Sequence, residues 1–114
     1  MVGVEIQPNV IVGGADKPVI AATVAKAGGG LFAITAEWCG YCKKLKNSVE
    51  TAKTIQPFDF FWMDGDKTPA HKKKSTELNV QGFPTIYYID KGGRLLPYSG
   101  GREPADLVHI FHRR

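Results

Sequence analysis

Two cysteines, Cys39 and Cys42, are the residues of this chain most able to do chemistry. They are its only cysteines, and two residues separate them. A Cys-x-x-Cys pair is typical of a redox-active dithiol or of half a zinc site. If the pair opens a helix, the free N–H groups and the dipole at the helix start favour a thiolate at Cys39. Cys42 then lies one turn further on, within reach of the first sulfur.

A zinc site is the first alternative reading of the pair. Structural zinc needs four ligands, and only His71, His109 and His112 could join the cysteines. His109 and His112 are the one paired option, and they lie in the helix expected at the far end of the chain. We therefore expect no metal site.

Two further alternatives concern the cysteines themselves. Inert core thiols would suit Cys42, but Cys39 stands beside Gly40 and Tyr41 and is expected to be exposed. A redox domain that has lost its activity and serves as a binding module stays open.

Apolar patterns predict strands that alternate with helices around the pair. Strands are expected at 10–12, 31–36, 58–64, 83–90 and 94–99, and helices should begin at Asp16, at the cysteines, at Thr68-Pro69 and at Glu103-Pro104. The last two strands form an antiparallel hairpin. This order implies an α/β fold in which a mixed sheet carries helices on both sides.

The helix of the cysteines is the clearest of these elements. A single apolar stripe runs along it, made of Cys42, Leu45, Val49 and Ala52. The lysines at 43, 44 and 46 are expected on its other faces. The first helix is expected to bury Ile20, Val24 and Ala27.

Composition limits the class of protein. The chain has 114 residues, 43% of them apolar, which suits a single domain, residues 1–114, with an N-terminal arm at 1–16 that holds a short edge strand. The net charge is +4, but no basic run is interleaved with aromatic residues, so we expect no nucleic-acid partner.

No apolar run is long enough to span a bilayer, so no membrane partner is expected. The first residues do not read as a signal peptide, which favours a cytoplasmic protein, or alternatively an exported protein whose signal has been removed. We expect a monomer.

Three motifs in order resemble those of the thioredoxin family. They are "WCGYCK" (38–43), "GFPT" (82–85) and "SGG" (99–101), and the resemblance runs from roughly Lys17 to His112. The order of elements predicted above is also that of the thioredoxin fold. The resemblance therefore implies that fold, with a mixed, mainly four- to five-stranded sheet and helices on both faces.

The resemblance also implies a role for each matching residue. Cys39 would attack a substrate disulfide and Cys42 would resolve the intermediate. The substrate would be bound by residues around the pair, namely Trp38, Tyr41, Phe83, Pro84, Gly100 and Gly101. Among these, Pro84 would be a cis-proline facing the disulfide, and the backbone of Phe83 would pair with the substrate strand.

Two departures from the family pattern matter. Tyr41 stands where thioredoxins usually have proline, and Ala33 stands where they have a buried acid that accepts the proton of the second cysteine. Glu37 is the nearest acid in sequence and is the candidate proton acceptor in its place.

Together these features predict a thiol–disulfide oxidoreductase that acts on protein substrates. No cofactor is expected beyond the Cys39–Cys42 disulfide, and an NADPH-linked reductase or another dithiol partner would recycle the pair. The sequence leaves open whether it reduces, oxidises or isomerises disulfides. The alternative is an interaction module that uses Trp38, Tyr41 and Phe83 without turnover.

Overall fold

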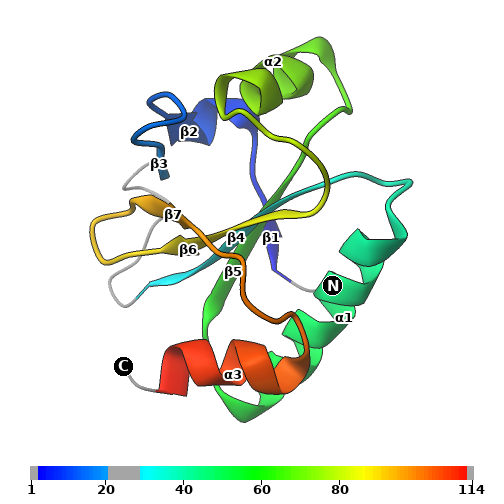
Figure 1. Cartoon of the computed structure of the whole chain (residues 1–114), viewed down its shortest axis with the longest axis vertical. Coiled ribbons are helices and arrows are strands. Elements are labelled where there is room, and N and C mark those ends of the chain that lie inside the picture. Colours follow the sequence, from blue (N-terminus) through cyan, green and yellow to red (C-terminus); the bar gives the residue numbers. More distant parts are fainter. Residues whose placement is uncertain (1–2, 21–28, 113–114) are drawn as a thin grey trace.

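The fold is built on a five-stranded mixed sheet, seen in a computed structural model that describes residues 3–20 and 29–112. The strand order is β1-β5-β4-β6-β7 (Figure 1). The strands are β1 (Val4–Glu5), β4 (Gly30–Thr35), β5 (Asp59–Asp64), β6 (Thr85–Ile89) and β7 (Leu95–Pro97). β1, β4 and β5 run parallel to one another. β6 pairs antiparallel with β4, and β7 pairs antiparallel with β6. The predicted mixed sheet is therefore confirmed.

Helices α1 (Gly40–Ile55) and α3 (Pro104–His112) cover one face of the sheet. The predicted stripe of α1 is buried, and it packs with Leu107 and Phe111 of α3 against Ala33 and Phe60 of the sheet. Phe58 and Phe111 stack with their ring centroids 4.4 Å apart. This layer fixes α1 against the end of β4, where the cysteines lie.

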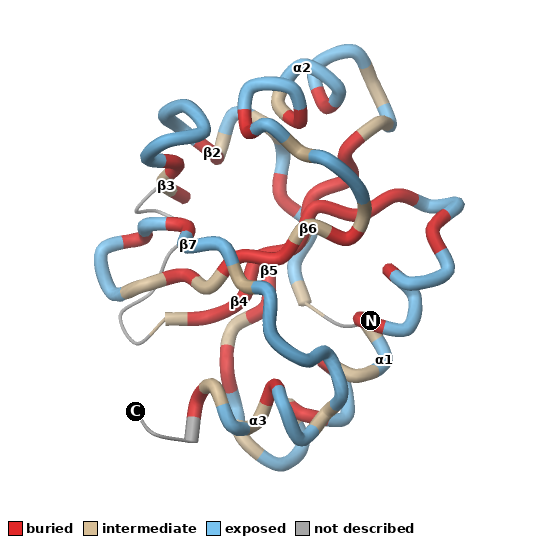
Figure 2. The backbone as a smooth tube through the Cα atoms, in the orientation of Figure 1, coloured by how far each residue is buried: buried red, intermediate tan, exposed pale blue. Residues whose placement is uncertain are grey.

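The opposite face is covered by α2 (Pro69–Glu77) and by the N-terminal segment. Thr68 caps α2 by accepting a hydrogen bond of 3.3 Å from the backbone N–H of His71. Leu78, just after the helix, joins the core of this face with Phe32 and Ile34 of β4. β4 is buried along its whole length (Figure 2), because its apolar side chains enter the cores on both faces of the sheet.

The N-terminal segment differs from its prediction in two ways. The expected helix does not begin at Asp16, because Val19–Ile20 form a strand, β3, paired antiparallel with β2 (Ile11–Val12). The backbone N–H of Ile20 also bonds to the carbonyl of Gly93 at 2.8 Å, so this segment is held extended against the hairpin. The remainder of the expected helix, with Val24 and Ala27, lies outside the described residues.

The strand expected at 10–12 is present at Ile11–Val12, but it does not form an edge of the main sheet. The strand at Ile11–Val12 belongs to a separate two-stranded sheet, and Val10 ends a short 3-10 helix, η1 (Pro8–Val10). The N-terminal edge of the main sheet is β1, which pairs with Phe61 and Trp62 of β5. None of the described helices is long and apolar enough to cross a bilayer.

Candidate dithiol site

The two cysteines lie where β4 leads into α1. Cys39 is the N-cap of the helix, with an extended backbone, and Cys42 lies in its first turn. The backbone N–H of Cys42 donates a hydrogen bond of 3.2 Å to Sγ of Cys39. Both cysteines are free thiols. The predicted helix start is confirmed, and it places one sulfur among the unpaired N–H groups of the first turn.

Both cysteines are buried, so the prediction that Cys39 is exposed was wrong. Cys39 is 4% exposed and Cys42 is 2% exposed. They pack with Ala36, and the ring of Phe83 adds to this cluster from the loop before β6. The prediction failed because it considered only the sequence neighbours of Cys39. Phe83 is distant in the sequence, and only the fold brings its loop to the cysteines.

An aromatic rim surrounds the dithiol. Trp38 is 69% exposed, and its ring meets that of Phe83 edge-on, with centroids 5.6 Å apart. Nε1 of Trp38 donates a hydrogen bond of 2.8 Å to Oδ2 of Asp66. Tyr41 is 67% exposed, with Nζ of Lys44 5.5 Å from its ring centroid. These three aromatic side chains leave an apolar surface open beside buried sulfurs.

The loop before β6 fits closely against the end of β5. The Phe83–Pro84 peptide bond is cis, and Pro84 is buried. A Cβ atom at Gly65 would lie 2.8 Å from Cζ of Phe83 and 2.9 Å from Cγ2 of Ile34. Glycine at position 65 therefore makes room for the ring that covers the cysteines.

Gly100 and Gly101 have a local reason to be glycines. A Cβ at Gly100 would lie 2.6 Å from the Tyr98 hydroxyl, and one at Gly101 would meet the Asp106 carboxylate. The Tyr98 hydroxyl donates a hydrogen bond of 2.6 Å to the carbonyl of Gly101. Their expected contact with a substrate chain stays a prediction.

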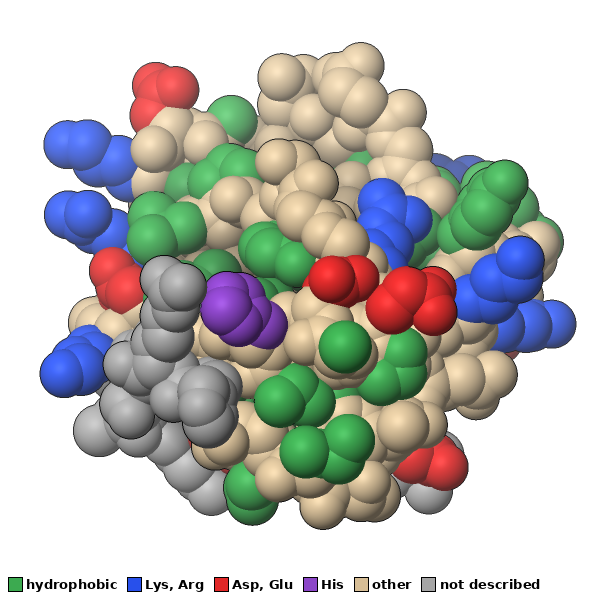
Figure 3. All heavy atoms as spheres, turned by 60° about the horizontal axis from the view of Figure 1, so that its bottom comes forward, with side chains coloured by type: hydrophobic (Ala, Val, Ile, Leu, Met, Phe, Trp, Pro, Cys, Tyr) green, Lys and Arg blue, Asp and Glu red, His purple; other side chains and the backbone are tan. Residues whose placement is uncertain are grey.

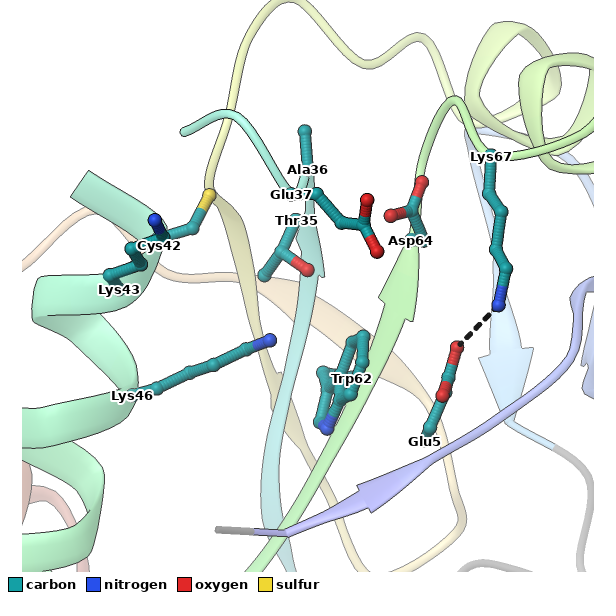
Figure 4. Close-up of a pocket in the computed structure, with 10 residues that line it drawn as sticks. All are labelled: Glu5, Thr35, Ala36, Glu37, Cys42, Lys43, Lys46, Trp62, Asp64 and Lys67. Carbon is teal, nitrogen blue, oxygen red and sulfur yellow. Dashed lines mark ion pairs between the residues drawn. The ribbon is translucent and has the colours of Figure 1, made fainter. Parts of the chain in front are cut away.

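A pocket of about 420 Å³ opens beside Cys42 (Figure 4). Several residues that line it were not predicted as part of the site, namely Glu5, Thr35, Lys43, Lys46, Trp62, Asp64 and Lys67. Lys43 and Lys46 lie outside the buried stripe of α1, as predicted, but the sequence analysis did not place them beside Cys42. Lys46 is one helical turn after Cys42, a spacing that places it on the same side of α1.

Register explains how β5 enters the pocket. Thr35 pairs with Asp64, and Ala33 pairs with Trp62, in the parallel ladder of β4 and β5. Because parallel strands end at the same edge of the sheet, Asp64 lies beside the strand that leads to the cysteines. The acid at the end of the 58–64 strand was the sequence signal that could have identified it.

The proton chemistry of this site is centred on Cys42. Burial, followed by the hydrogen bond with Cys39, raises the pKa of the Cys42 thiol to about 12, although the charge of Lys46 acts in the opposite direction. Ala33 is fully buried on the face that carries α1, so no carboxyl group stands at the family position. Glu37 is exposed and lines the pocket together with Asp64, which is 4% exposed.

Two further predictions concern metal ions and nucleic acid. In the part of the chain that the structure describes, no three His, Cys, Asp or Glu side chains are grouped as metal ligands. On the face shown in Figure 3, acidic and basic side chains are interspersed with apolar ones. The expected lack of a nucleic-acid partner remains a prediction.

A helix-capping dithiol beside a cis-proline loop, on a mixed sheet of this strand order, is the arrangement of the thioredoxin fold. Chloroplastic thioredoxin z superposes with a TM-score of 0.70 at 21% identity, covering 99% of this chain and 94% of that one. Thioredoxin from Fasciola hepatica superposes with a TM-score of 0.57 at 26% identity, over 77% of this chain and 82% of the other. The thioredoxin family model matches residues 15–113. The chain belongs to the thioredoxin family.

Curated relatives carry the name of disulfide isomerases. Protein disulfide-isomerase erp38 of Neurospora crassa is 38% identical over 82% of this chain and 27% of its own length. Protein disulfide-isomerase of Zea mays is 32% identical over 73% of this chain and 16% of its own. The chain thus spans about a quarter or less of these relatives. They support a thiol–disulfide oxidoreductase in general.

Proposed function

We propose that the chain exchanges disulfides with protein substrates through Cys39 and Cys42. The observation that carries this proposal is the hydrogen bond from the Cys42 N–H to Sγ of Cys39 at the start of α1. The same N–H group would stabilise a thiolate on Cys39, and the thiolate is the form that attacks a disulfide.

The exchange proceeds in two steps. The Cys39 thiolate attacks one sulfur of a substrate disulfide, forms a mixed disulfide and releases the other substrate sulfur as a thiolate. Cys42 then loses its proton and attacks Sγ of Cys39, which forms the Cys39–Cys42 disulfide and releases the second substrate sulfur. The two released thiolates take protons from solvent, so the substrate gains two electrons and two protons. The reverse sequence oxidises a substrate, and no group beyond the two cysteines takes part.

The aromatic rim is the substrate surface in this proposal. Trp38 and Tyr41 offer exposed apolar area beside the sulfurs, while the backbone of Phe83, before Pro84, pairs with an extended substrate segment. Gly100 and Gly101 allow the substrate backbone to approach closely. Glu37, at the mouth of the pocket, accepts the Cys42 proton through water.

The names of the curated relatives favour the isomerase or oxidase direction. Such activity belongs to an oxidising compartment, which favours the exported alternative over a cytoplasmic one. A dithiol partner or an NADPH-linked reductase returns the pair to its working redox state, and the domain acts as a monomer.

Trapping of mixed disulfides tests this function. With disulfide-bonded insulin or scrambled ribonuclease as substrate, reduced Cys42→Ser should accumulate a mixed disulfide through Cys39, and Cys39→Ser should accumulate none. Wild-type protein should turn over the same substrates. Equal trapping by the two variants, or no turnover by wild type, would contradict the proposal.

The exposed rim also favours a second candidate, an interaction module without turnover. A Cys39→Ser/Cys42→Ser double variant that keeps binding and cellular function would support this second candidate. Loss of function in the double variant, with binding retained, would support the oxidoreductase.

A further inference from the structure

The pocket beside Cys42 holds an ammonium group without a carboxylate partner. Lys46 reaches from α1 across the pocket toward β5 (Figure 4), and its Nζ lies 3.5 Å from the ring centroid of Trp62. Among the residues that the structure describes, no carboxylate forms an ion pair with Lys46. Lys46 and Trp62 are both half-buried, so water screens this charge less than it would at the surface.

Space for this arrangement comes from Ala33. Its methyl group faces Trp62 across the β4–β5 ladder, on the side of the sheet that carries α1. A longer acidic side chain at position 33 would add a negative charge and volume beside the indole. In this chain the group beside Cys42 is instead a cation held over an aromatic ring.

The charges around Cys42 come from β1, α1, β5 and the loops that follow β4 and β5. Three ammonium groups and three carboxylates line it, namely Lys43, Lys46 and Lys67, with Glu5, Glu37 and Asp64. Glu5 pairs with Lys67 at 3.9 Å, and Oδ1 of Asp64 accepts the backbone N–H of Asp66 at 2.9 Å. Loss of Lys46 would leave the pocket with a net negative charge, which disfavours a thiolate on Cys42.

We propose that Lys46, held over the ring of Trp62, is a positioning residue that stabilises the Cys42 thiolate during resolution of the mixed disulfide. In that step Cys42 gives its proton to water in the pocket, its thiolate bonds to Sγ of Cys39, and the substrate sulfur leaves and takes up a proton. Electrons pass from Cys42 to the departing substrate sulfur, and Lys46 keeps its own proton throughout. This proposal deepens the proposed function and rests on it.

The test measures Cys42 alone and needs no substrate. In a Cys39→Ser background, the rate of alkylation by iodoacetamide between about pH 7 and 9 reports the thiolate fraction of Cys42. Lys46→Met keeps the apolar stem against Trp62 and removes the charge, and it should lower the rate on the order of three- to tenfold. Lys46→Arg should restore most of the rate.

Lys53→Met is the matched control, because it removes one positive charge from the last turn of α1, away from the pocket. It should leave the alkylation rate unchanged, and all variants should react equally once unfolded in guanidinium. Equal rates in folded Lys46→Met and Lys53→Met, or no recovery with Lys46→Arg, would overturn the proposal. If Lys46→Met does not fold, Lys46→Gln gives the same comparison. Failure of turnover in the wild type would defeat the proposed function but leave this measurement standing.

Discussion

The indole of Trp38 is held in place by Asp66, with 2.8 Å between Nε1 and Oδ2. This hydrogen bond joins the loop before α1 to the loop after β5, and it fixes an exposed ring edge-on against Phe83. An exposed aromatic side chain would otherwise sample several rotamers. The bond therefore keeps the apolar rim in one shape beside the sulfurs.

Asp66→Ala should weaken substrate exchange more than it weakens the fold. A typical hydrogen bond contributes about 0.5–1.5 kcal/mol, and an exposed one lies at the low end of that range, so the free energy of unfolding should fall by less than about 1 kcal/mol. We expect kcat/KM for a protein disulfide to drop severalfold, because the Trp38 ring becomes mobile. Glu50→Ala, an exposed acid on α1, is the control for loss of charge. Equal activity of the two variants would show that the bond does not organise the rim.

The raised pKa of Cys42 predicts how stability changes with pH. Burial holds the pKa near 12, against the ordinary 9.0, so the folded protein keeps this proton at pH values where the unfolded chain releases it. The contribution to stability is therefore complete below about pH 9 and is lost as pH rises from there toward 12. Urea unfolding under reducing conditions should show that the wild type loses stability relative to Cys42→Ser between pH 9 and 10, by at most about 1.4 kcal/mol. A difference that stays constant with pH would contradict the burial of a neutral thiol.

Tyr41 should set the redox potential of the pair above that of thioredoxin. It lies in the first turn of α1, where its N–H needs no helical partner, so proline fits there without strain. We expect a potential between about −270 and −180 mV for the wild type, and a shift toward the lower value in Tyr41→Pro. Equilibration with glutathione measures both, with Tyr41→Phe as the control for loss of the hydroxyl. A wild-type value at or below that of thioredoxin would refute this prediction.

Ala33→Asp should make resolution faster and the fold less stable. The side chain is fully buried between Trp62 and Ile86 of the neighbouring strands, so a carboxyl group there costs on the order of 1–3 kcal/mol. Burial of that acid favours its neutral form and suits it to accept and return a proton near pH 7. Stopped-flow turnover and melting temperature test the two effects, with Ala33→Val as the control for added volume. No gain in rate, together with strong slowing by Glu37→Gln, would assign the proton acceptor to Glu37 instead.

The elements that the sequence predicts best are those in which the spacing of apolar residues shows directly which faces are buried. The residues from Cys42 to Ala52 lie on one face only if the segment is a helix. The continuous apolar run of β4 fits a strand that is covered on both sides. Both predictions were confirmed, since each depends on nearby residues alone. The three aromatic residues of the rim lie around the cysteines as the thioredoxin resemblance implied.

The errors all concern contacts between distant segments. Ile20, Val24 and Ala27 have the spacing of a helix, but Val19 and Ile20 pair with β2 and the hairpin instead. Val4 and Glu5 are two exposed residues with no pattern of their own, and only β5 makes them a strand. The burial of Cys39 depends on Phe83, and the pocket depends on the register that brings β5 beside β4. Such pairings are tertiary, and local sequence does not encode them.

The absence of a side chain at Gly65 ties two segments of the chain to one another. Phe83 can cover the cysteines only while position 65 stays bare, and a larger residue at 65 fits only when the ring at 83 is smaller. Substitutions at the two positions should therefore be non-additive, each altering what the other permits. Substitutions at position 65, after β5, and at position 83, before β6, are therefore epistatic. A larger residue at 65 alone would clash with Phe83 and with Ile34, whereas a smaller residue at 83 alone would uncover the cysteines without any clash.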